Sequence, residues 1–538
     1  MVAKRIRYRR AAAAVAAGAL PCLAFPAPAL WWFAYVALVP WMLLLRSAPT
    51  GRRAALEGWL GGAAFIVAVH HWLLPSLHVF LLPVAALVGL LWIPWALLVR
   101  EFLGGTPDPG RAAAALLLVP AGWLLSELAR SWQGLGGPWG LLGASQWQVP
   151  PALRLASVGG VWLVSLLVVA VNCALVLLIS VPGARVPAVA GVTGCVVLTG
   201  AVWLWVPRPE VSGTLRVAVV QPGLVADGPD SAQQRFDAGE RLTRTLTGQR
   251  MDLVVWGESS VGADLAARPD LARRLAALSS DVGAPLLVNV DARRPAGPVG
   301  GPVPGPAAGP VAAAATASGG GIYKSSVLVG PGGPTGDRYD KMRLVPFGEY
   351  IPARSLLGWA TSVGKAAGED RRRGAEPVLM KLPGRPGVRI GPLVCFESAF
   401  PDMSRRLTGD GAALLIAQSA TSSFQRSWAP AQHASLAALR AAEDGRPMVH
   451  ATLTGISAVH GPSGERIGPA LPTSARAAQV YEVPLSRGST FYVRFGNWPG
   501  GACLALLAAY CAVEGVRSLG LRKPAPEPTT PPARTARG

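Results

Sequence analysis

Long apolar stretches separate a part of the chain that is expected to lie in a membrane from a part that is expected to be water-soluble. Seven runs of about 20 apolar residues precede residue 210, and an eighth lies near 498–517. A helix of about 20 residues crosses the hydrocarbon core of a bilayer. The pattern therefore predicts a polytopic α-helical bundle of about eight spans. The first seven runs lie near 11–28, 30–46, 55–76, 79–100, 111–128, 159–181 and 186–206.

The first of these runs also has the shape of a secretory signal peptide, because an Arg-rich flank and an apolar stretch lead to Ala27-x-Ala29. A second apolar run begins almost at once, and a whole bundle follows it. We therefore expect the first run to stay in the protein as an uncleaved helix.

Positive charge is distributed unevenly among the predicted loops, and cytoplasmic loops of membrane proteins are enriched in Lys and Arg. With the N-terminus in the cytoplasm, the loops expected inside carry arginines, whereas the loop between the third and fourth runs has neither Lys nor Arg. This orientation places residues 207–497 outside the cytoplasm. The fifth connection, with Arg130 and Arg154, fits the rule least well. The arginines expected inside are Arg46, Arg52, Arg53, Arg100, Arg111 and Arg185.

That fifth connection, residues 131–151, is rich in Trp and Gly and too irregular in its pattern to span a bilayer. Trp side chains favour the interface between lipid and water. We expect a re-entrant or surface-lying segment near the lipid headgroups, and an ordinary amphipathic loop is the alternative.

Between about residues 214 and 486 the pattern changes to short β-branched runs that alternate with helical stretches. Such alternation predicts an α/β fold built around a sheet. The predicted strands lie in 215–223, 251–259, 284–292, 388–398 and 412–420, and two of the predicted helices lie in 264–279 and 430–444.

The expected domains follow from these changes of pattern. An N-terminal membrane domain of about seven helices covers 1–210, and an extracytoplasmic domain covers 211–490. A last transmembrane helix covers 491–520, and a disordered basic cytoplasmic tail covers 521–538. Inside the second domain, a Pro/Gly/Ala stretch at 295–321 is expected to be a flexible insertion.

Composition supports the membrane assignment. Hydrophobic residues make up 51% and charged residues only 15% of the chain, whereas soluble proteins carry roughly 25% charged residues. The formal net charge of +20 would by itself suit a nucleic-acid-binding protein. Much of that charge lies in Arg clusters beside apolar runs, so it indicates topology, and no nucleic acid partner is expected.

Five of the six cysteines fall in apolar membrane runs, which leaves Cys395 alone in the water-soluble domain. A lone cysteine is often only a small buried hydrophobic residue. Cys395, however, follows a predicted strand and precedes Phe396-Glu397-Ser398 at the start of a predicted helix. A strand-to-helix turn presents a nucleophile beside backbone N–H groups. We therefore predict that Cys395 is a covalent nucleophile.

A cysteine nucleophile needs a base that removes its proton and a positive group that stabilises an oxyanion. Glu258 ends an apolar strand, where burial would raise its pKa and suit it to proton transfer. Lys341 lies in the segment 339–352, which reads YDKMRLVPFGEYIP. Taken alone, both residues would be assigned to the solvated surface. The six His show no metal-ligand spacing, and neither a metal nor any other cofactor is expected.

Three motifs together resemble the nitrilase, or carbon–nitrogen hydrolase, superfamily. They are WGES with Glu258, YDKMRLVPFGEYIP with Lys341 and Glu349, and LVCFES with Cys395, in the order of that superfamily's Glu–Lys–Cys set and with similar spacing. Seven apolar runs precede this domain, one follows it, and PWGLLGASQ stands at 138–146. Nearly the whole chain thus resembles the apolipoprotein N-acyltransferase family, and the resemblance implies an αββα sandwich beside the membrane bundle.

The resemblance implies an acyltransferase of the bacterial cytoplasmic (inner) membrane with an extracytoplasmic catalytic domain. Glu258 would act as the base, Lys341 would stabilise the oxyanion and Cys395 would carry the acyl group as a thioester. The donor would be a membrane phospholipid, and the acceptor would be the α-amino group of a lipoprotein's diacylglyceryl-cysteine. Glu349 and Glu397 would orient Lys341 or the incoming amine, and a helix cap or ion pair is their alternative role. The protein is expected to act as a monomer.

Three positions depart from the family's pattern. The loop at 417–424 lacks the usual Asn-Asp-x-Trp-Phe-like string, Phe396 stands where the family has Tyr, and Tyr323-Lys324 stands where it has Tyr-Asn. These changes are expected to alter the pocket wall, of which Phe396 is part, and they leave open a paralogue with weak or altered acyl transfer. His433, Arg440 and Glu443 resemble a helix of the family and are interpreted as structural.

Two other functions compete with acyl transfer. A membrane-tethered amidase would give its acyl group to water, but a soluble amide substrate needs one anchor helix rather than eight spans. A transporter would carry polar residues inside its spans. The few ionisable residues found in the apolar runs lie near their predicted ends, and they are Glu57, His70, His71 and Glu127.

Overall fold

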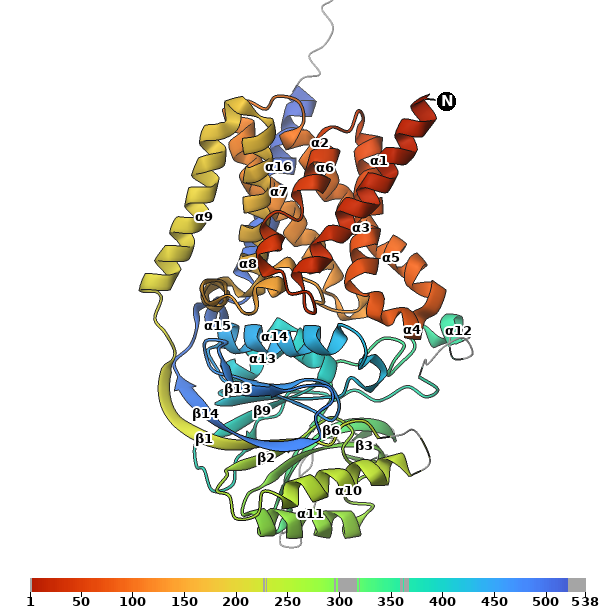
Figure 1. The fold of residues 1–538 in the computed structure, drawn as a ribbon, viewed down its shortest axis with the longest axis vertical. Helices are drawn as coiled ribbons and strands as arrows, with labels where there is room; N and C mark the ends of the chain where they lie inside the picture. The colour runs from red at the N-terminus through yellow and green to blue at the C-terminus, as the bar shows by residue number, and fades with distance from the viewer. Residues whose placement is uncertain are drawn as a thin grey trace, which may run out of the picture.

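A computed structural model of the protein describes residues 2–225, 228, 230–294, 297–298, 317–318, 320–358, 361 and 367–520. A helical bundle stands on an α/β domain, and the chain's N-terminus lies at the end of the bundle away from that domain (Figure 1). The predicted insertion at 295–321 lies mostly outside the described residues, and the predicted basic tail at 521–538 lies wholly outside them.

Each predicted apolar run lies on one or more helices of the bundle. Among the residues that the structure describes, five helical segments are long and apolar enough to cross a membrane: His71–Leu103, Pro109–Arg130, Pro150–Ser180, Pro182–Trp205 and Trp498–Ser518. The first three predicted runs fall on shorter or more charged helices, so the number of spans stays a prediction. The bundle helices are α1 (Val2–Ala19), α2 (Val39–Arg46), α3 (Gly51–Val69), α4 (Leu74–Leu77), α5 (Leu81–Gly89), α6 (Ile93–Leu103), α7 (Pro109–Arg130), α8 (Pro150–Ser180), α9 (Arg185–Trp205) and α16 (Trp498–Gly520).

The loop arginines gather at one end of the bundle. Arg46 Nε donates to the Leu103 carbonyl at 2.9 Å, and Arg100 Nε donates to the Ala48 carbonyl at 3.1 Å. Arg10 pairs with Glu57 across α1 and α3, with 2.7 Å between Nε and Oε1. In Figure 1 the end of α2 and the start of α1 lie at the end of the bundle opposite the α/β domain.

The two arginines that fit the charge rule least well are buried. Arg130 places its guanidinium 5.9 Å from the centre of the Phe65 ring. Arg154 donates to the carbonyl of Val206, where α9 ends. Both side chains therefore serve packing and hydrogen bonding inside the protein, and neither is a loop charge of the kind that the rule counts.

The connection after α7 is exposed at its start and buried farther along. Trp132 is 66% exposed, whereas residues 137–146 are buried and form no long helix. Glu127 Oε1 accepts the Leu142 N–H at 2.7 Å, and Ser165 Oγ accepts the Gly143 N–H at 2.8 Å. Irregular backbone at membrane depth needs protein partners of this kind. A re-entrant segment stays a prediction for 131–151, and its residues 137–146 lie inside the protein.

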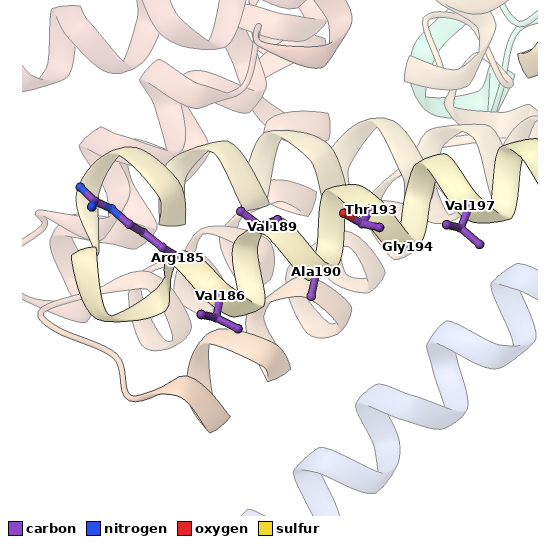
Figure 2. Close-up of a pocket in the computed structure, with 7 residues that line it drawn as sticks. All are labelled: Arg185, Val186, Val189, Ala190, Thr193, Gly194 and Val197. Carbon is purple, nitrogen blue, oxygen red and sulfur yellow. The ribbon is translucent and has the colours of Figure 1, made fainter.

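A shallow cavity of about 670 Å³ lies along α9. Figure 2 shows its lining side chains along this helix, and they are mainly apolar, with Arg185 at one end. Only Ala188 and Val202 of α9 are buried. Apolar side chains on such a helix face lipid chains, and no lining residue belongs to the α/β domain.

The α/β domain is a sandwich of two six-stranded sheets with helices outside, so the αββα expectation is confirmed. The first sheet has the order β14-β1-β2-β3-β6-β7, and the second has β13-β12-β11-β10-β9-β8. All five strands predicted from the sequence are present. The strands are β1 (Glu210–Gln221), β2 (Leu253–Trp256), β3 (Leu286–Arg294), β6 (Gly321–Gly330), β7 (Gly333–Asp340), β8 (Met380–Lys381), β9 (Arg389–Val394), β10 (Leu414–Ser419), β11 (Met448–Thr452), β12 (Ser457–His460), β13 (Arg466–Leu471) and β14 (Ala477–Arg487). A separate pair joins β4 (Gly297–Pro298) to β5 (Ala317–Ser318).

Apolar side chains fill three layers. Val217, Val255 and Ile416 belong to the core between the two sheets, because alternate residues of a strand point to one face. Helices α10 (Ser231–Arg244) and α11 (Pro269–Val282) cover the first sheet. Helices α13 (Pro401–Gly409) and α14 (Ala429–Asp444) lie between the second sheet and the bundle (Figure 1).

That third layer joins the two parts of the protein in one hydrophobic core. Leu436 and Leu439 of α14 share a cluster with Leu393 and Leu415 of the second sheet and with Leu153 of α8. Burial of apolar side chains stabilises by roughly 1.5–3 kcal/mol each. The α/β domain is therefore packed against the bundle and does not hang from it by a linker.

A hydrogen bond from an interruption in helix α8 also links the bundle to the α/β domain. Helix α8 is interrupted at Gly159–Gly160, and Gly160 has φ +66°. A Cβ at Gly160 would lie 2.7 Å from the Tyr492 ring, so glycine allows the close approach. The interruption frees the Val161 N–H, which donates to Glu443 Oε1 at 2.7 Å. Glu443 also pairs with buried Arg440 at 2.6 Å, as expected of structural residues.

We expect Glu443→Ala to lower the free energy of unfolding by about 3–5 kcal/mol, because Arg440 would be left as an unpaired buried charge. A lower thermal midpoint of the detergent-solubilised protein would measure the effect. Glu482→Ala, which removes an exposed carboxylate on β14, is the control and should leave the midpoint unchanged. Equal midpoints for both variants would contradict a structural role for Glu443.

Candidate active site

Cys395 stands at the end of β9 in a strained backbone conformation. Its φ is +49°, a left-handed value that is unusual for a residue other than glycine. A short 3₁₀ helix, Cys395–Ala399, begins at this residue. The Cys395 carbonyl accepts a hydrogen bond from Ser398 Oγ at 2.9 Å and lies 3.1 Å from His433 Nε2. The turn resembles other nucleophile-bearing turns, in which strain lifts the side chain out of the sheet.

The structure brings together three of the charged residues predicted from the sequence. Glu258 follows β2, and its N–H donates to the Ser419 carbonyl of the second sheet at 3.2 Å. Lys341 follows β7 and is buried. Its Nζ lies 3.3 Å from Glu258 Oε1 and 2.8 Å from Glu349 Oε1. Glu349 is thus a direct partner of Lys341, as expected.

Sequence analysis did not include Lys324 among the site residues. This lysine lies on β6, and its Nζ is 2.7 Å from Glu258 Oε1 and 3.3 Å from Glu349 Oε1. It was noted only as a departure from the family's Tyr-Asn. A single lysine inside the strand IYKSSVLVG, which is otherwise uncharged, was the available signal, because lysine is almost never buried unless it is paired.

An outer ion pair completes the charge balance. Asp291 Oδ2 lies 3.8 Å from Lys324 Nζ and 3.0 Å from Arg371 Nη2. Ser259 Oγ donates to the same carboxylate at 3.1 Å. The site therefore holds three carboxylates and three cations, which satisfies the requirement that buried charges be paired. Among the described residues, no group of three His, Cys, Asp or Glu side chains could hold a metal ion.

The pKa shifts of Cys395 and Glu349 have opposite directions. Burial and the Glu258 carboxylate raise the pKa of Cys395 to about 12, although Lys341 and Lys324 oppose the shift. Burial alone would raise the pKa of Glu349, but Lys341 and Lys324 lower it to about 2. At neutral pH the resting site therefore holds a thiol beside ionised carboxylates.

The expected direction of the Glu258 pKa shift was wrong. Burial by itself would raise this pKa, as predicted, but the ammonium groups of Lys324 and Lys341 lower it below its ordinary value. An opposite charge within a few ångströms outweighs burial here. Glu258 is thus an ionised carboxylate able to accept a proton, and it is not a protonated acid.

Glu397 supports the loops around the nucleophile. Its Oε2 accepts the Val394 N–H at 2.8 Å, and its Oε1 accepts the Met342 and Arg343 N–H groups at 2.7 and 3.0 Å. Tyr339 donates to Oε1 at 2.7 Å. Among the described residues it makes no hydrogen bond to Lys341, so its contacts are those of the alternative role, a helix cap. Glu397 ties the backbone after Lys341 to the backbone before Cys395.

Phe396 lies buried on the side of the site that faces the bundle. Its ring meets Phe400 edge-to-face, with 4.8 Å between ring centres. Gly137, at φ +74°, packs against both rings, and a Cβ there would lie 2.7 Å from Phe400 and 3.0 Å from Phe396. The PWGLLGASQ segment at 138–146 thus begins where the bundle contacts the turn that carries Cys395.

Aromatic side chains of the bundle also hold the loop after β10. The Ala420 carbonyl lies 4.0 Å from Cys395 Sγ, so this loop borders the nucleophile. Farther along the loop, Phe424 meets Trp72 at 5.0 Å, and Trp428 meets His71 at 4.5 Å between ring centres. The departure at 417–424 therefore affects a loop that joins the nucleophile to the bundle.

Comparisons with known proteins agree with this arrangement. The model described as apolipoprotein N-acyltransferase N-terminal domain matches residues 17–174, and the carbon-nitrogen hydrolase model matches residues 216–490. The apolipoprotein N-acyltransferase of Azotobacter vinelandii is 32% identical, over 93% of this chain and 94% of the relative. That of Geobacter metallireducens is 29% identical, over 93% and 94%. A solved structure of an amidase of the nitrilase superfamily from Nesterenkonia covers 52% of this chain and 93% of its own, at 19% identity and TM-score 0.32.

We expect Glu258→Gln to slow both reactions that need the Cys395 thiolate at neutral pH. Acylation of Cys395 by p-nitrophenyl butyrate should slow by about 100-fold to 10,000-fold, because the base is lost. Alkylation of Cys395 by iodoacetamide should slow as well, because it too needs the thiolate and burial raises the pKa of Cys395. Both rates should recover as the pH is raised, because hydroxide then removes the proton in place of Glu258. Release of p-nitrophenol and intact mass would follow the two reactions. Rates that stay low at every pH would indicate a collapsed site rather than a missing base.

Proposed function

Since the chain belongs to the apolipoprotein N-acyltransferase family, we propose that it moves a fatty acyl chain from a membrane phospholipid to the α-amino group of a lipoprotein's diacylglyceryl-cysteine. The enzyme is an acyltransferase of lipoprotein N-acylation. The donor, the covalent intermediate and the site residues are our proposal. The observation that carries it is a partly exposed cysteine, beside a paired carboxylate and two ammonium groups, on a turn whose next residue, Phe396, packs in the core shared with the bundle.

In the first half-reaction Cys395 is acylated. The proton of Sγ passes to Glu258, and the thiolate attacks the ester carbonyl of the phospholipid. Lys341 and the backbone N–H after Cys395 stabilise the oxyanion. The C–O bond of the ester breaks, the lysophospholipid alkoxide takes the proton back from Glu258, and a thioester remains on Cys395.

In the second half-reaction the acyl group leaves the enzyme. The α-amino group of the lipoprotein attacks the thioester carbonyl and gives a proton to Glu258. The C–S bond breaks, the proton returns to Sγ, and the new amide departs. A thioester suits this step because it yields to amines more readily than the ester it replaced. Two substrates that use one site in turn give ping-pong kinetics.

Supporting roles follow from the contacts. Glu349 holds the Lys341 ammonium at 2.8 Å, and Glu397 fixes the loops on which Lys341 and Cys395 stand. Phe396 shapes the wall towards the bundle. We propose that the protein acts as a monomer, since one chain supplies all of these residues. We propose the domain limits 1–210, 211–490 and 491–520; the last long bundle helix before the strands ends at Trp205, and β1 begins at Glu210.

The bundle gives a physical reason for acyl transfer rather than hydrolysis. Both substrates are lipids, so the nucleophile must lie near the headgroups. The loop after β10 packs on the bundle through Trp72, and helix α14 does so through Trp139. A soluble amide would need none of this.

We propose that the protein spans the bacterial cytoplasmic (inner) membrane with its catalytic domain outside the cytoplasm. The support is the gathering of Arg46, Arg100 and Arg111 at the end of the bundle away from that domain, since arginines favour the cytoplasmic side.

The acyl-enzyme can be detected by intact mass after the purified protein is incubated with phospholipid. Wild type should gain one fatty-acyl mass that hydroxylamine removes, and Cys395→Ser should gain no hydroxylamine-labile mass, because an oxygen ester resists that treatment better than a thioester does. Addition of a diacylglyceryl lipopeptide should then discharge the adduct and acylate the peptide. Discharge to free fatty acid at the same rate with and without lipopeptide would favour the amidase alternative.

The orientation can be tested with reporter fusions at residues 185 and 300. A reporter active only in the cytoplasm should work at 185, and one active only outside should work at 300, because an odd number of crossings would separate the two positions. Extracytoplasmic activity at 185 would contradict the proposed topology.

A further inference from the structure

Lys324 places a second ammonium group in the centre of the site. Its side chain is only 12% exposed, so water contributes little to its stabilisation and carboxylates must do so. The lysine lies on β6, in the interior of the first sheet, and its backbone carbonyl accepts the Lys341 N–H at 2.8 Å. The two lysines are therefore held as a unit by the backbone as well as by their charges.

Lys324 and Lys341 bind the same two oxygen atoms. Glu258 Oε1 lies 2.7 Å from Lys324 Nζ and 3.3 Å from Lys341 Nζ. Glu349 Oε1 lies 3.3 Å from Lys324 Nζ and 2.8 Å from Lys341 Nζ. The four groups form a ring of alternating charge. We call this ring, Glu258–Lys324–Glu349–Lys341, the charge ring.

Both lysines of the charge ring bind the same carboxylate oxygen of Glu258, and neither binds the other oxygen. Within the part of the chain that the structure describes, both donors to Glu258 bind Oε1, and none binds Oε2. The shorter of the two contacts comes from Lys324. Oε2 is therefore the atom of Glu258 that is open to a proton, while Oε1 is anchored.

We propose that Lys324 is a positioning residue, which keeps Glu258 ionised and anchors its Oε1 so that Oε2 receives the proton of Cys395. The proposal rests on the function proposed above for Glu258 as base. It extends that function by giving this chain a second lysine whose charge sets the pH range in which the base works. Lys324 acts through Glu258 and needs no contact with either substrate.

The sign of the effect on pH dependence follows from the charges. Lys324 is among the groups that lower the pKa of Glu258, and a carboxylate base works only above its pKa. Without the Lys324 charge, this pKa rises, and activity is lost at the acid end of the range. The charged or titratable groups that act on Glu258 or lie against the charge ring are Lys341, Glu349, Asp291, Arg371, Cys395 and His433.

The test compares wild type with Lys324→Gln and with Lys324→Arg, which keeps the charge. Acylation of Cys395 in the full-length protein is measured against pH with p-nitrophenyl butyrate and, separately, with phospholipid vesicles. In the pH–rate profile, the acid limb is the range in which the rate falls as the pH is lowered. For Lys324→Gln we expect this acid limb to move to higher pH by about 1–3 pH units. The rate on the plateau should be retained, because Glu258 becomes the stronger base. Lys324→Arg should keep the wild-type limb.

A rate that falls by the same factor at every pH in Lys324→Gln would overturn the proposal and indicate a structural role only. If Lys324→Gln does not fold, Lys324→Gln combined with Asp291→Asn restores equal numbers of positive and negative charges. Its limb should still lie above that of wild type, because Lys324 is closer to Glu258 than to Asp291. An unshifted limb in that double variant would also overturn the proposal.

The two substrates distinguish this proposal from the proposed function. If p-nitrophenyl butyrate shows the shifted limb and phospholipid acylates neither protein, the role of Lys324 stands and phospholipid is not the donor. If both substrates acylate Cys395 with the same limb in wild type and Lys324→Gln, the proposed function stands and the role of Lys324 fails.

Discussion

The pairing of buried charges is the constraint on which the site depends. Glu258 and Lys341 are almost fully buried, and isolated charges there would cost several kcal/mol each. The charge ring offsets this cost because its two carboxylates alternate with two ammonium groups. Beside the ring, Asp291 pairs with Arg371. Strands β2 and β6 and the segment after β7 must therefore converge for any one of these side chains to remain ionised.

The nucleophile depends on a second constraint, which is contact with the bundle. The turn at Cys395 is strained, and such a conformation persists only where its surroundings hold it. His433 and Ser398 hold the Cys395 carbonyl, Glu397 holds the backbone before it through the Val394 N–H, and Gly137 of the bundle packs against Phe396. Because the supports come from both parts of the chain, catalysis and attachment to the membrane share one packed interface.

Elements with a strong local pattern could be predicted from the sequence. The strands around 251–259 and 388–398 and the helix at 430–444 are confirmed, because a buried strand or helix reveals itself in runs of apolar residues. For the connection at 131–151 the sequence left a re-entrant segment, a surface-lying segment and an amphipathic loop open, since its Trp and Gly residues suit a lipid interface as well as a protein interior. The hydrogen bonds to Glu127 and Ser165, which the tertiary structure supplies, show that Leu142 and Gly143 lie inside the protein.

The sequence by itself determined the family, the α/β sandwich beside a helical bundle and the choice of Glu258, Lys341 and Cys395 as site candidates, because apolar runs and short motifs are local properties of a chain. The tertiary structure alone decided that Lys324 belongs to the charge ring and that the pKa of Glu258 is lowered. Both facts depend on distances between side chains that lie 66 and 83 positions apart in the sequence. Electrostatic energy depends on such distances, and no local pattern of residues encodes them.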